Sequence, residues 1–228
     1  MSAQPSRADV AAMIDHTLLA PEATDPDVEA LCAEAIELGV CAACVSASRV
    51  PAAARALGGS QVRLAAVVGF PSGAHLAAVK ADEATRAVAD GASEIDMVID
   101  LGYAAVGDWA MVGEEIGAVR GAAASPVVLT VIIESAALTD PQIDAACAAC
   151  VAAGADYMKT STGFHPAGGA SEAAVARMAA GVRSAGLGVK ASGRIRTAAQ
   201  ALAMIAAGAT RLGMSRTAQV LADLEAGS

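Results

Sequence analysis

Residues 157–164 read Tyr-Met-Lys-Thr-Ser-Thr-Gly-Phe. A short apolar run ends in Lys159, and hydroxyl side chains and Gly163 follow the lysine at once. This pattern is typical of a strand that opens into a polar loop. Lys190 closes the next such run and opens into Ala-Ser-Gly. We therefore expect two consecutive strands that each end in an amine.

Lysine is scarce in this chain. Lys80, Lys159 and Lys190 are the only three, against twelve arginines. Arginine stays protonated in proteins, whereas the amine of a lysine can lose its proton. Two scarce amines at the ends of consecutive strands therefore indicate chemistry that needs a neutral nitrogen.

Around these two strands, short β-like runs alternate with alanine-rich amphipathic stretches of helical length. The expected strands are residues 13–16, 40–45, 63–68, 94–99, 127–133, 157–160, 188–191 and 211–213. Capping residues open several helical stretches, at Thr24, Asp108, Thr139, Ser171 and Thr197. Glycines stand where helices should end, at Gly39, Gly59, Gly91, Gly121, Gly154, Gly186, Gly208 and Gly227.

Eight strands alternating with eight helices predict an α/β fold, and the count favours a closed (β/α)8 TIM barrel over an open doubly wound sheet. No G-x-G-x-x-G follows the first strand, which argues against a dinucleotide-binding sheet. The chain has no linker, charge run or low-complexity tract, so we expect residues 1–228 to form one domain. Residues 6–12 are expected to form a short extra helix before the first strand.

Composition and charge restrict the classes of partner. The chain is 55% apolar but 2% aromatic, so its core must be aliphatic. No apolar run reaches the ~18 residues of a membrane helix, and the N-terminus does not resemble a secretory signal. We therefore expect a cytoplasmic protein with no membrane partner. A net charge of −9 argues against nucleic acid, and means that a local positive patch must attract any anionic substrate.

The five cysteines form two C-x-x-C pairs, Cys41/Cys44 and Cys147/Cys150, with Cys32 left over. Such pairs can hold zinc, so a zinc or redox protein is one hypothesis. The first pair lies in a strand-like run, where residues three apart point to opposite faces. The second pair shares an apolar helix face. We therefore favour buried apolar cysteines and expect no metal.

Asp96 lies in the middle of the fourth expected strand, on the same face as Glu94 and Asp100. A barrel interior does not accept an unpaired carboxylate, so Asp96 needs a partner, and a barrel-facing lysine is the obvious one. We place Glu94 and Asp100 on the rim or in solvent. The alternative for Asp96 with Lys190 is a purely structural ion pair.

Two lysines that face one carboxylate suggest catalysis. A free lysine has a pKa of about 10.4, whereas a useful nucleophile needs roughly 7–8. Two ammonium groups ~5 Å apart repel by about 3 kcal/mol at an effective dielectric of ~20, and burial adds to this. One lysine can then attack a carbonyl carbon and form an imine. Spacing leaves open which lysine attacks, although the open loop after Lys159 favours that residue.

Backbone N–H groups after glycines are candidates for binding a phosphate. They follow the sixth, seventh and eighth expected strands, at Gly163, Ser192, Gly193, Gly213 and Ser215. Arg196 and Arg216 lie close by in the sequence. One such glycine would indicate only a turn, but three on successive units favour an anion site.

Six motifs resemble the 2-deoxyribose-5-phosphate aldolase family over essentially the whole chain. They are Asp15-His16-Thr17-Leu18-Leu19, Val68-Gly69-Phe70-Pro71, Glu94-Ile95-Asp96-Met97-Val98-Ile99, Lys159-Thr160-Ser161-Thr162-Gly163-Phe164, Lys190-Ala191-Ser192-Gly193 and Gly213-Met214-Ser215. The resemblance implies a class I aldolase on a (β/α)8 barrel that needs no metal or other cofactor. It would reversibly cleave 2-deoxy-D-ribose 5-phosphate to D-glyceraldehyde 3-phosphate and acetaldehyde, in deoxyribose phosphate catabolism.

The resemblance also implies residue roles and partners. Lys159 is similar to the imine-forming lysine, and Asp96 and Lys190 to the proton-transfer pair. The implied phosphate contacts are Gly163, Gly193, Gly213 and Ser215. The implied partners are a small phosphorylated sugar and short aldehydes, and a homodimer is compatible because members of the family are often dimers.

The chain departs from the family pattern at three places. Arg194 stands where a second glycine is common, residues 46–47 read Ser-Ala where Asn-Pro is usual, and residues 221–228 contain no aromatic side chain. The first departure bears on phosphate affinity. It leaves an alternative function, a barrel that binds a phosphorylated metabolite without cleaving it.

Overall fold

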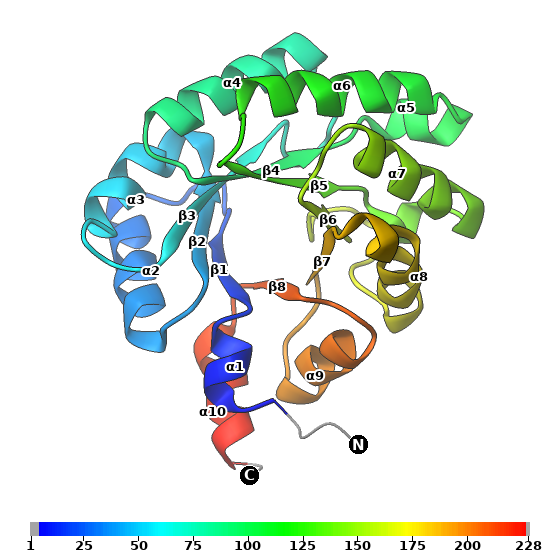
Figure 1. Ribbon diagram of the computed structural model, residues 1–228. Helices are drawn as coiled ribbons and strands as arrows, with labels where there is room; N and C mark the ends of the chain where they lie inside the picture. Colours follow the sequence, from blue (N-terminus) through cyan, green and yellow to red (C-terminus); the bar gives the residue numbers. More distant parts are fainter. Residues whose placement is uncertain (1–4, 227–228) are drawn as a thin grey trace.

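Eight parallel strands close into a barrel in the computed structural model, which describes residues 5–226 (Figure 1). The strands pair in chain order, and β8 pairs back onto β1. They are β1 (Ile14–Leu18), β2 (Ala42–Ser46), β3 (Arg63–Val68), β4 (Glu94–Val98), β5 (Val128–Ile132), β6 (Tyr157–Lys159), β7 (Gly188–Ser192) and β8 (Arg211–Met214). The predicted (β/α)8 TIM barrel is therefore confirmed, with each strand within two residues of its expected start.

Helices surround the barrel (Figure 1). The α-helices are α1 (Arg7–Ala11), α2 (Asp25–Leu38), α3 (Val50–Ala56), α4 (Ala77–Ala89), α5 (Leu101–Val106), α6 (Trp109–Ala122), α7 (Asp140–Ala152), α8 (Glu172–Val182), α9 (Ala198–Ala206) and α10 (Thr217–Ala226). Short 3-10 turns are η1 (Ala47–Arg49), η2 (Ser135–Ala137) and η3 (Arg183–Ala185). The expected extra helix is α1, which lies beside α10 through an ion pair of 3.0 Å between Arg7 and Glu225. The sequence did not predict α5, which starts because the Asp100 carboxylate accepts from Gly102 N at 2.7 Å.

Local capping fixes where the helices begin and end. All five predicted caps are confirmed, with side-chain hydrogen bonds or capping boxes at Thr24, Asp108, Thr139, Ser171 and Thr197. Gly39 ends α2 with a left-handed φ of 67°, a conformation that favours glycine. The prediction for Gly121 is wrong, because α6 continues through it to Ala122. Gly227 lies outside the described residues.

The alternation of β4 separates the apolar core from the polar interior. Ile95 and Met97 belong to the main apolar cluster between barrel and helices, whereas Glu94 and Asp96 are buried polar residues on the other face. The cluster is built from Ala, Val, Leu, Ile, Met and Cys, as the low aromatic content requires. Within the described part of the chain, no helix is both long and apolar enough to cross a bilayer.

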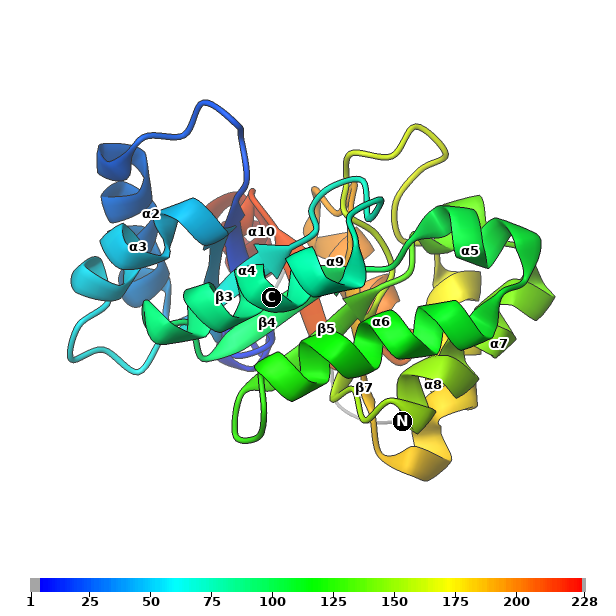
Figure 2. The same ribbon diagram turned by 90° about the horizontal axis from the view of Figure 1, so that it is seen from above.

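The long loops after β1, β3 and β6 rise on the same side of the barrel, at the carboxyl ends of the strands (Figure 2). Parallel strands place the ends of all eight at one rim, so residues distant in the chain can meet there. This rim is where the predicted site residues of β6, β7 and β8 come together.

Candidate active site

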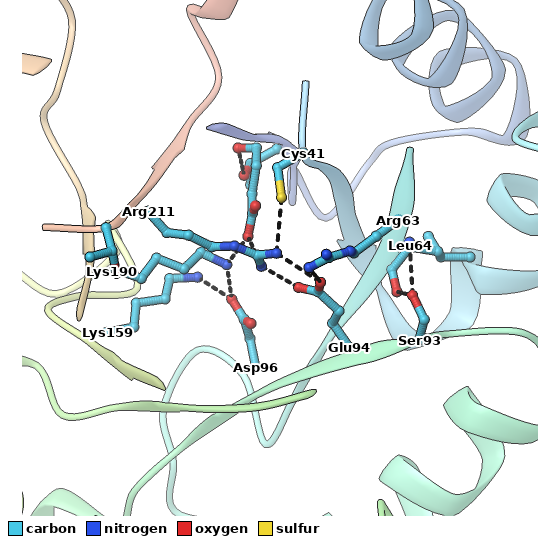
Figure 3. A network of polar contacts seen from close by, with 12 residues as sticks. Cys41, Arg63, Leu64, Ser93, Glu94, Asp96, Lys159, Lys190 and Arg211 are labelled. Atoms are coloured by element: carbon cyan, nitrogen blue, oxygen red, sulfur yellow. Dashed lines mark hydrogen bonds and ion pairs between the residues drawn. The ribbon is translucent and has the colours of Figure 1, made fainter. Parts of the chain in front are cut away.

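Lys159 and Lys190 meet on one carboxylate inside the barrel (Figure 3). The two residues lie opposite each other in the β6–β7 ladder. Each Nζ donates to Asp96 Oδ2 over 2.7 Å, and all three side chains are at most 4% exposed. The predicted partnership between Asp96 and a barrel-facing lysine is therefore confirmed, and it involves both lysines.

Lys190 has a second carboxylate partner that the sequence did not reveal. Its Nζ forms a close ion pair with Asp15 of β1, and Arg211 lies 3.5 Å from the same Asp15 oxygen. Burial alone would lower the pKa of Lys190, but the charges of Asp15 and Asp96 outweigh it and raise this pKa above its usual range. Burial also raises the pKa of Asp15. Lys190 is therefore an ammonium group at neutral pH.

Asp96 is ionised. Burial would raise its pKa, but the charges and hydrogen bonds of Lys159 and Lys190 outweigh burial and hold the pKa well below the usual range. Its second oxygen, Oδ1, is buried and has no hydrogen-bond partner within residues 5–226. A carboxylate with one occupied and one free oxygen can accept a proton from a bound molecule.

A second group of ion pairs lies beside these residues (Figure 3), and two of its members, Glu94 and Arg211, are the first residues of β4 and β8. Arg211 donates twice to Glu94, with one distance of 2.9 Å, and lies 5.2 Å from the ring centre of Tyr157. Arg63 reaches the same carboxylate over 3.2 Å from the outside. The prediction that Glu94 is a rim or solvent residue is therefore wrong: it is fully buried, because Arg211 arrives from β8 to neutralise it.

The third lysine has no part in this arrangement. Lys80 is fully buried on α4, where its Nζ donates to Glu115 over 2.5 Å and to the Val98 carbonyl over 2.8 Å. These partners hold α4 against α6 and the end of β4. Only two of the three lysines therefore reach the barrel interior.

A cavity of about 780 Å³ opens above Lys159 at the carboxyl rim. Lys159 borders it, whereas Lys190 and Asp96 lie beneath and do not. All five residues predicted to bind phosphate border the cavity: Gly163, Ser192, Gly193, Gly213 and Ser215. Arg194, Arg196 and Arg216 border it as well.

The hydroxyls of the motif after Lys159 join two loops of the site. Thr160 Oγ1 accepts from Ser192 N over 2.9 Å and donates to Ser192 O over 3.0 Å, and Ser192 Oγ donates to Ser161 O. Gly163 N donates to Ser161 Oγ over 2.9 Å. The polar groups of Ser192 and the amide of Gly163 are thus engaged within the protein.

Other amides of the rim remain available. The N–H groups of Gly193, Arg194, Ile195, Ser215 and Arg216 donate to no acceptor within the described residues. They lie on the loops after β7 and β8, the usual position of phosphate sites in such barrels. Unsatisfied N–H groups that line a cavity from two loops can bind an anion.

Glu134 supports the loop after β6, a role that the sequence did not indicate. Its buried carboxylate accepts from Thr162 N and, over 3.2 Å, from Thr162 Oγ1. Its backbone is left-handed, with φ of 49°, which is unusual for a residue with a side chain. Through these hydrogen bonds Glu134 holds the loop that carries Gly163.

Four of the five cysteines are buried, as predicted, whereas Cys41 is only partly buried, so the prediction for Cys41 is wrong. Cys44 is buried in the barrel beside Ala65 and Val67, and burial raises the pKa of its thiol to about 12. Cys147 and Cys150 are buried on α7, as their spacing predicted. All five are free thiols, and no group of metal-ligating side chains is present among residues 5–226.

Comparison with known proteins agrees with this geometry. Residues 9–219 match the model of the family described as DeoC/LacD family aldolase. The chain belongs to this family. The deoxyribose-phosphate aldolase of Kocuria rhizophila is 58% identical over 220 residues, which cover 96% of this chain and 99% of the relative.

Two further members of the family match over nearly their full length. The deoxyribose-phosphate aldolase of Mycobacterium tuberculosis is 59% identical over 229 residues, covering 98% of this chain and 100% of the relative. The solved deoxyribose phosphate aldolase of Aeropyrum pernix is 34% identical and superposes with a TM-score of 0.89, over 98% of this chain and 94% of that structure. The resemblance inferred from the six motifs is therefore confirmed.

Proposed function

We propose that this DeoC/LacD family aldolase cleaves 2-deoxy-D-ribose 5-phosphate to D-glyceraldehyde 3-phosphate and acetaldehyde, with Lys159 as the residue that forms the imine. One observation supports Lys159 over Lys190. Lys159 borders the cavity, whereas Lys190 is fully buried between Asp15 and Asp96. A carbonyl carbon in the cavity can therefore reach only the amine of Lys159. The names of the relatives supply the substrate.

The reaction begins when the amine of Lys159, after transfer of its proton to a base, attacks the aldehyde carbon, C1, of the open-chain sugar. Loss of water leaves a protonated imine, which acts as an electron sink. A base removes the proton of the C3 hydroxyl, the C2–C3 bond breaks, and its electron pair moves toward the imine to form an enamine. Protonation at C2 and hydrolysis then release acetaldehyde and the free lysine.

Asp96 and Lys190 are proposed to move the protons of these steps. Asp96 is ionised and has a free oxygen but does not border the cavity, so it is proposed to act as the base through a water molecule. Lys190 is an ammonium group on the other oxygen of Asp96, so it supplies protons and restores the charge of the carboxylate.

The phosphate is proposed to lie on the loops after β7 and β8. Gly193 and Ser215 offer free amides there. Gly213 has no side chain that would crowd the cavity, since a Cβ at this position would lie 3.1 Å from Ser192 Cβ. Gly163 and Ser192 are proposed to complete this rim. Their own polar groups are engaged, so they shape the pocket by holding the two loops together.

A barrel that binds a phosphorylated metabolite without cleaving it is not favoured. The relatives matched over their full length are aldolases by name, and Arg194, the residue that suggested this alternative, lies outside the Lys159–Asp96–Lys190 cluster. We further propose a cytoplasmic location, which fits five free thiols. A homodimer stays a prediction.

Trapping of the imine tests the proposal. Incubation with acetaldehyde and borohydride should leave a reduced two-carbon adduct on the tryptic peptide that carries Lys159. Lys159→Arg keeps the charge and removes the nucleophile, so it should lose both the adduct and acetaldehyde release in a coupled assay while circular dichroism stays unchanged. Adduct confined to Lys80 or to the N-terminus would contradict the assignment of Lys159.

A further inference from the structure

Three arginines around the cavity have no carboxylate partner. Most arginines in residues 5–226 form an ion pair. The exceptions are Arg55, Arg183, Arg194, Arg196 and Arg216. The last three border the cavity, where Glu22 is the only acidic residue. The chain carries a net charge of −9, so carboxylates are plentiful elsewhere. Unpaired guanidinium groups gathered at one rim therefore indicate an anionic ligand.

Arg194 is in addition held in an unfavourable backbone conformation. Its φ is 65°, and Glu134 is the only other described residue besides glycines with a positive φ. The left-handed region is unfavourable for a residue with a Cβ, whereas glycine adopts it freely. Glu134 makes hydrogen bonds that offset its strain. The exposed side chain of Arg194 has no hydrogen bond or ion pair within the described protein that would do the same.

The position of Arg194 relates this strain to the cavity. Gly193 before it has φ of 86° and is packed so closely that a Cβ would lie 2.7 Å from Ser161 Oγ. The carbonyl groups of Ser192 and Gly193 accept from Ala170 N over 3.0 and 3.2 Å, which turns the loop so that the amides of Gly193 and Arg194 stay free. The guanidinium of Arg194 thus begins from the same turn as the free amides.

From these observations we infer that Arg194 is a specificity-determining residue, whose guanidinium binds the phosphate of the sugar and selects phosphorylated over unphosphorylated substrates. This inference rests on the proposed function. Backbone amides can hold a phosphate, but an arginine adds a charged, two-pronged donor that an uncharged hydroxyl cannot match. Arg216, on the facing loop after β8, is placed to assist from the other side. The unfavourable φ persists because the side chain acts on substrate, not on the stability of the fold.

The test compares kcat/KM for 2-deoxyribose 5-phosphate with kcat/KM for 2-deoxyribose. Arg194→Asn removes the charge with a residue that tolerates φ above zero, and Arg194→Gly removes the strain as well. Both variants should lower the ratio roughly tenfold or more, mainly through a higher KM for the phosphorylated sugar. Arg183→Asn changes the net charge equally at an exposed site on η3, away from the cavity, and should leave the ratio unchanged.

Stability gives a second readout. Arg194→Gly should unfold at the same temperature as the wild type or higher, because the left-handed strain is gone. A lower midpoint together with an unchanged ratio would mean that Arg194 is structural, and would overturn the inference. An equal fall of the ratio in Arg183→Asn would also overturn it, because the effect would then come from net charge.

Binding of inorganic phosphate separates this inference from the proposed function. Calorimetry should show weaker binding of inorganic phosphate to Arg194→Asn than to wild type or Arg183→Asn. If the wild type cleaves neither sugar, the proposed function fails, but the phosphate titration still decides the role of Arg194. If the wild type cleaves the phosphorylated sugar and Arg194→Asn keeps both the ratio and the phosphate affinity, only the inference about Arg194 is lost.

Discussion

Replacement of Lys190 by methionine tests the coupling between the two lysines of the site. Both Nζ atoms donate to the same Asp96 oxygen over 2.7 Å, so they lie within ~5 Å of each other. Two like charges at that distance repel by about 3 kcal/mol at an effective dielectric of ~20. Methionine keeps a long unbranched side chain in the barrel but removes the charge.

Loss of this repulsion removes about 3 kcal/mol that favours an uncharged amine next to Lys190. An energy of that size corresponds to a factor of ~100 in the rate of a step that needs the uncharged amine. Imine formation in Lys190→Met should therefore be ~100-fold slower at neutral pH than in wild type, and the difference should shrink as the pH rises. Loss of Lys190 merely as a proton donor would instead lower the rate by one factor at every pH.

The assay follows imine formation alone, so that later proton transfers do not interfere. Acetaldehyde is trapped with cyanoborohydride over a range of pH, and ethylated Lys159 is quantified by mass spectrometry. Because Lys190→Met leaves Asp15 with less positive charge around it, the double variant Asp15→Asn/Lys190→Met serves as a charge-balanced companion. A folded Lys190→Met variant whose rate falls by the same factor at every pH, or does not fall, would refute the coupling.

Three further predictions concern stability and the anion rim. Glu94→Gln should lower the free energy of unfolding, measured in urea, by about 3–5 kcal/mol, because it breaks a buried ion pair. Arg63→Gln removes the exposed partner of the same carboxylate and should lower it by under ~1 kcal/mol. Equal losses in the two variants would contradict the burial argument. The pKa of Asp96 is lower in the folded than in the unfolded chain, so its contribution is present above about pH 4 and lost below. Acidification from about pH 5 to pH 2 should therefore destabilise wild type more than Asp96→Asn, and parallel curves would argue against this. Gly193→Ala should weaken binding of inorganic phosphate. Gly39→Ala is the control, because Gly39 is also left-handed but has nothing within 4 Å of the added Cβ, so this variant should only lose stability. Normal phosphate affinity in both variants would contradict a role of Gly193 in phosphate binding.

Local pattern predicted most of the fold. The apolar periodicity of the strands, the caps such as Thr24 and the glycine stops such as Gly39 act over a few residues, so the sequence alone revealed them. The α5 helix was missed because Asp100 looked like a rim carboxylate, whereas its side chain caps a new helix. Gly121 was misjudged because packing of α6 on the barrel outweighs the weak helix propensity of glycine.

The site was also predicted in part from the sequence. The sequence by itself determined that two scarce lysines end consecutive strands and that Asp96 faces the barrel, since both facts depend on strand periodicity and chain order. Only the tertiary structure decided that Asp15 pairs with Lys190, that Arg211 pairs with the buried Glu94, and that Lys159 borders the cavity whereas Lys190 does not. These depend on which strands become neighbours when β8 closes onto β1 and on their stagger. Closure brings together charges up to about two hundred positions apart, and a buried charge is stable only beside the partner that closure supplies.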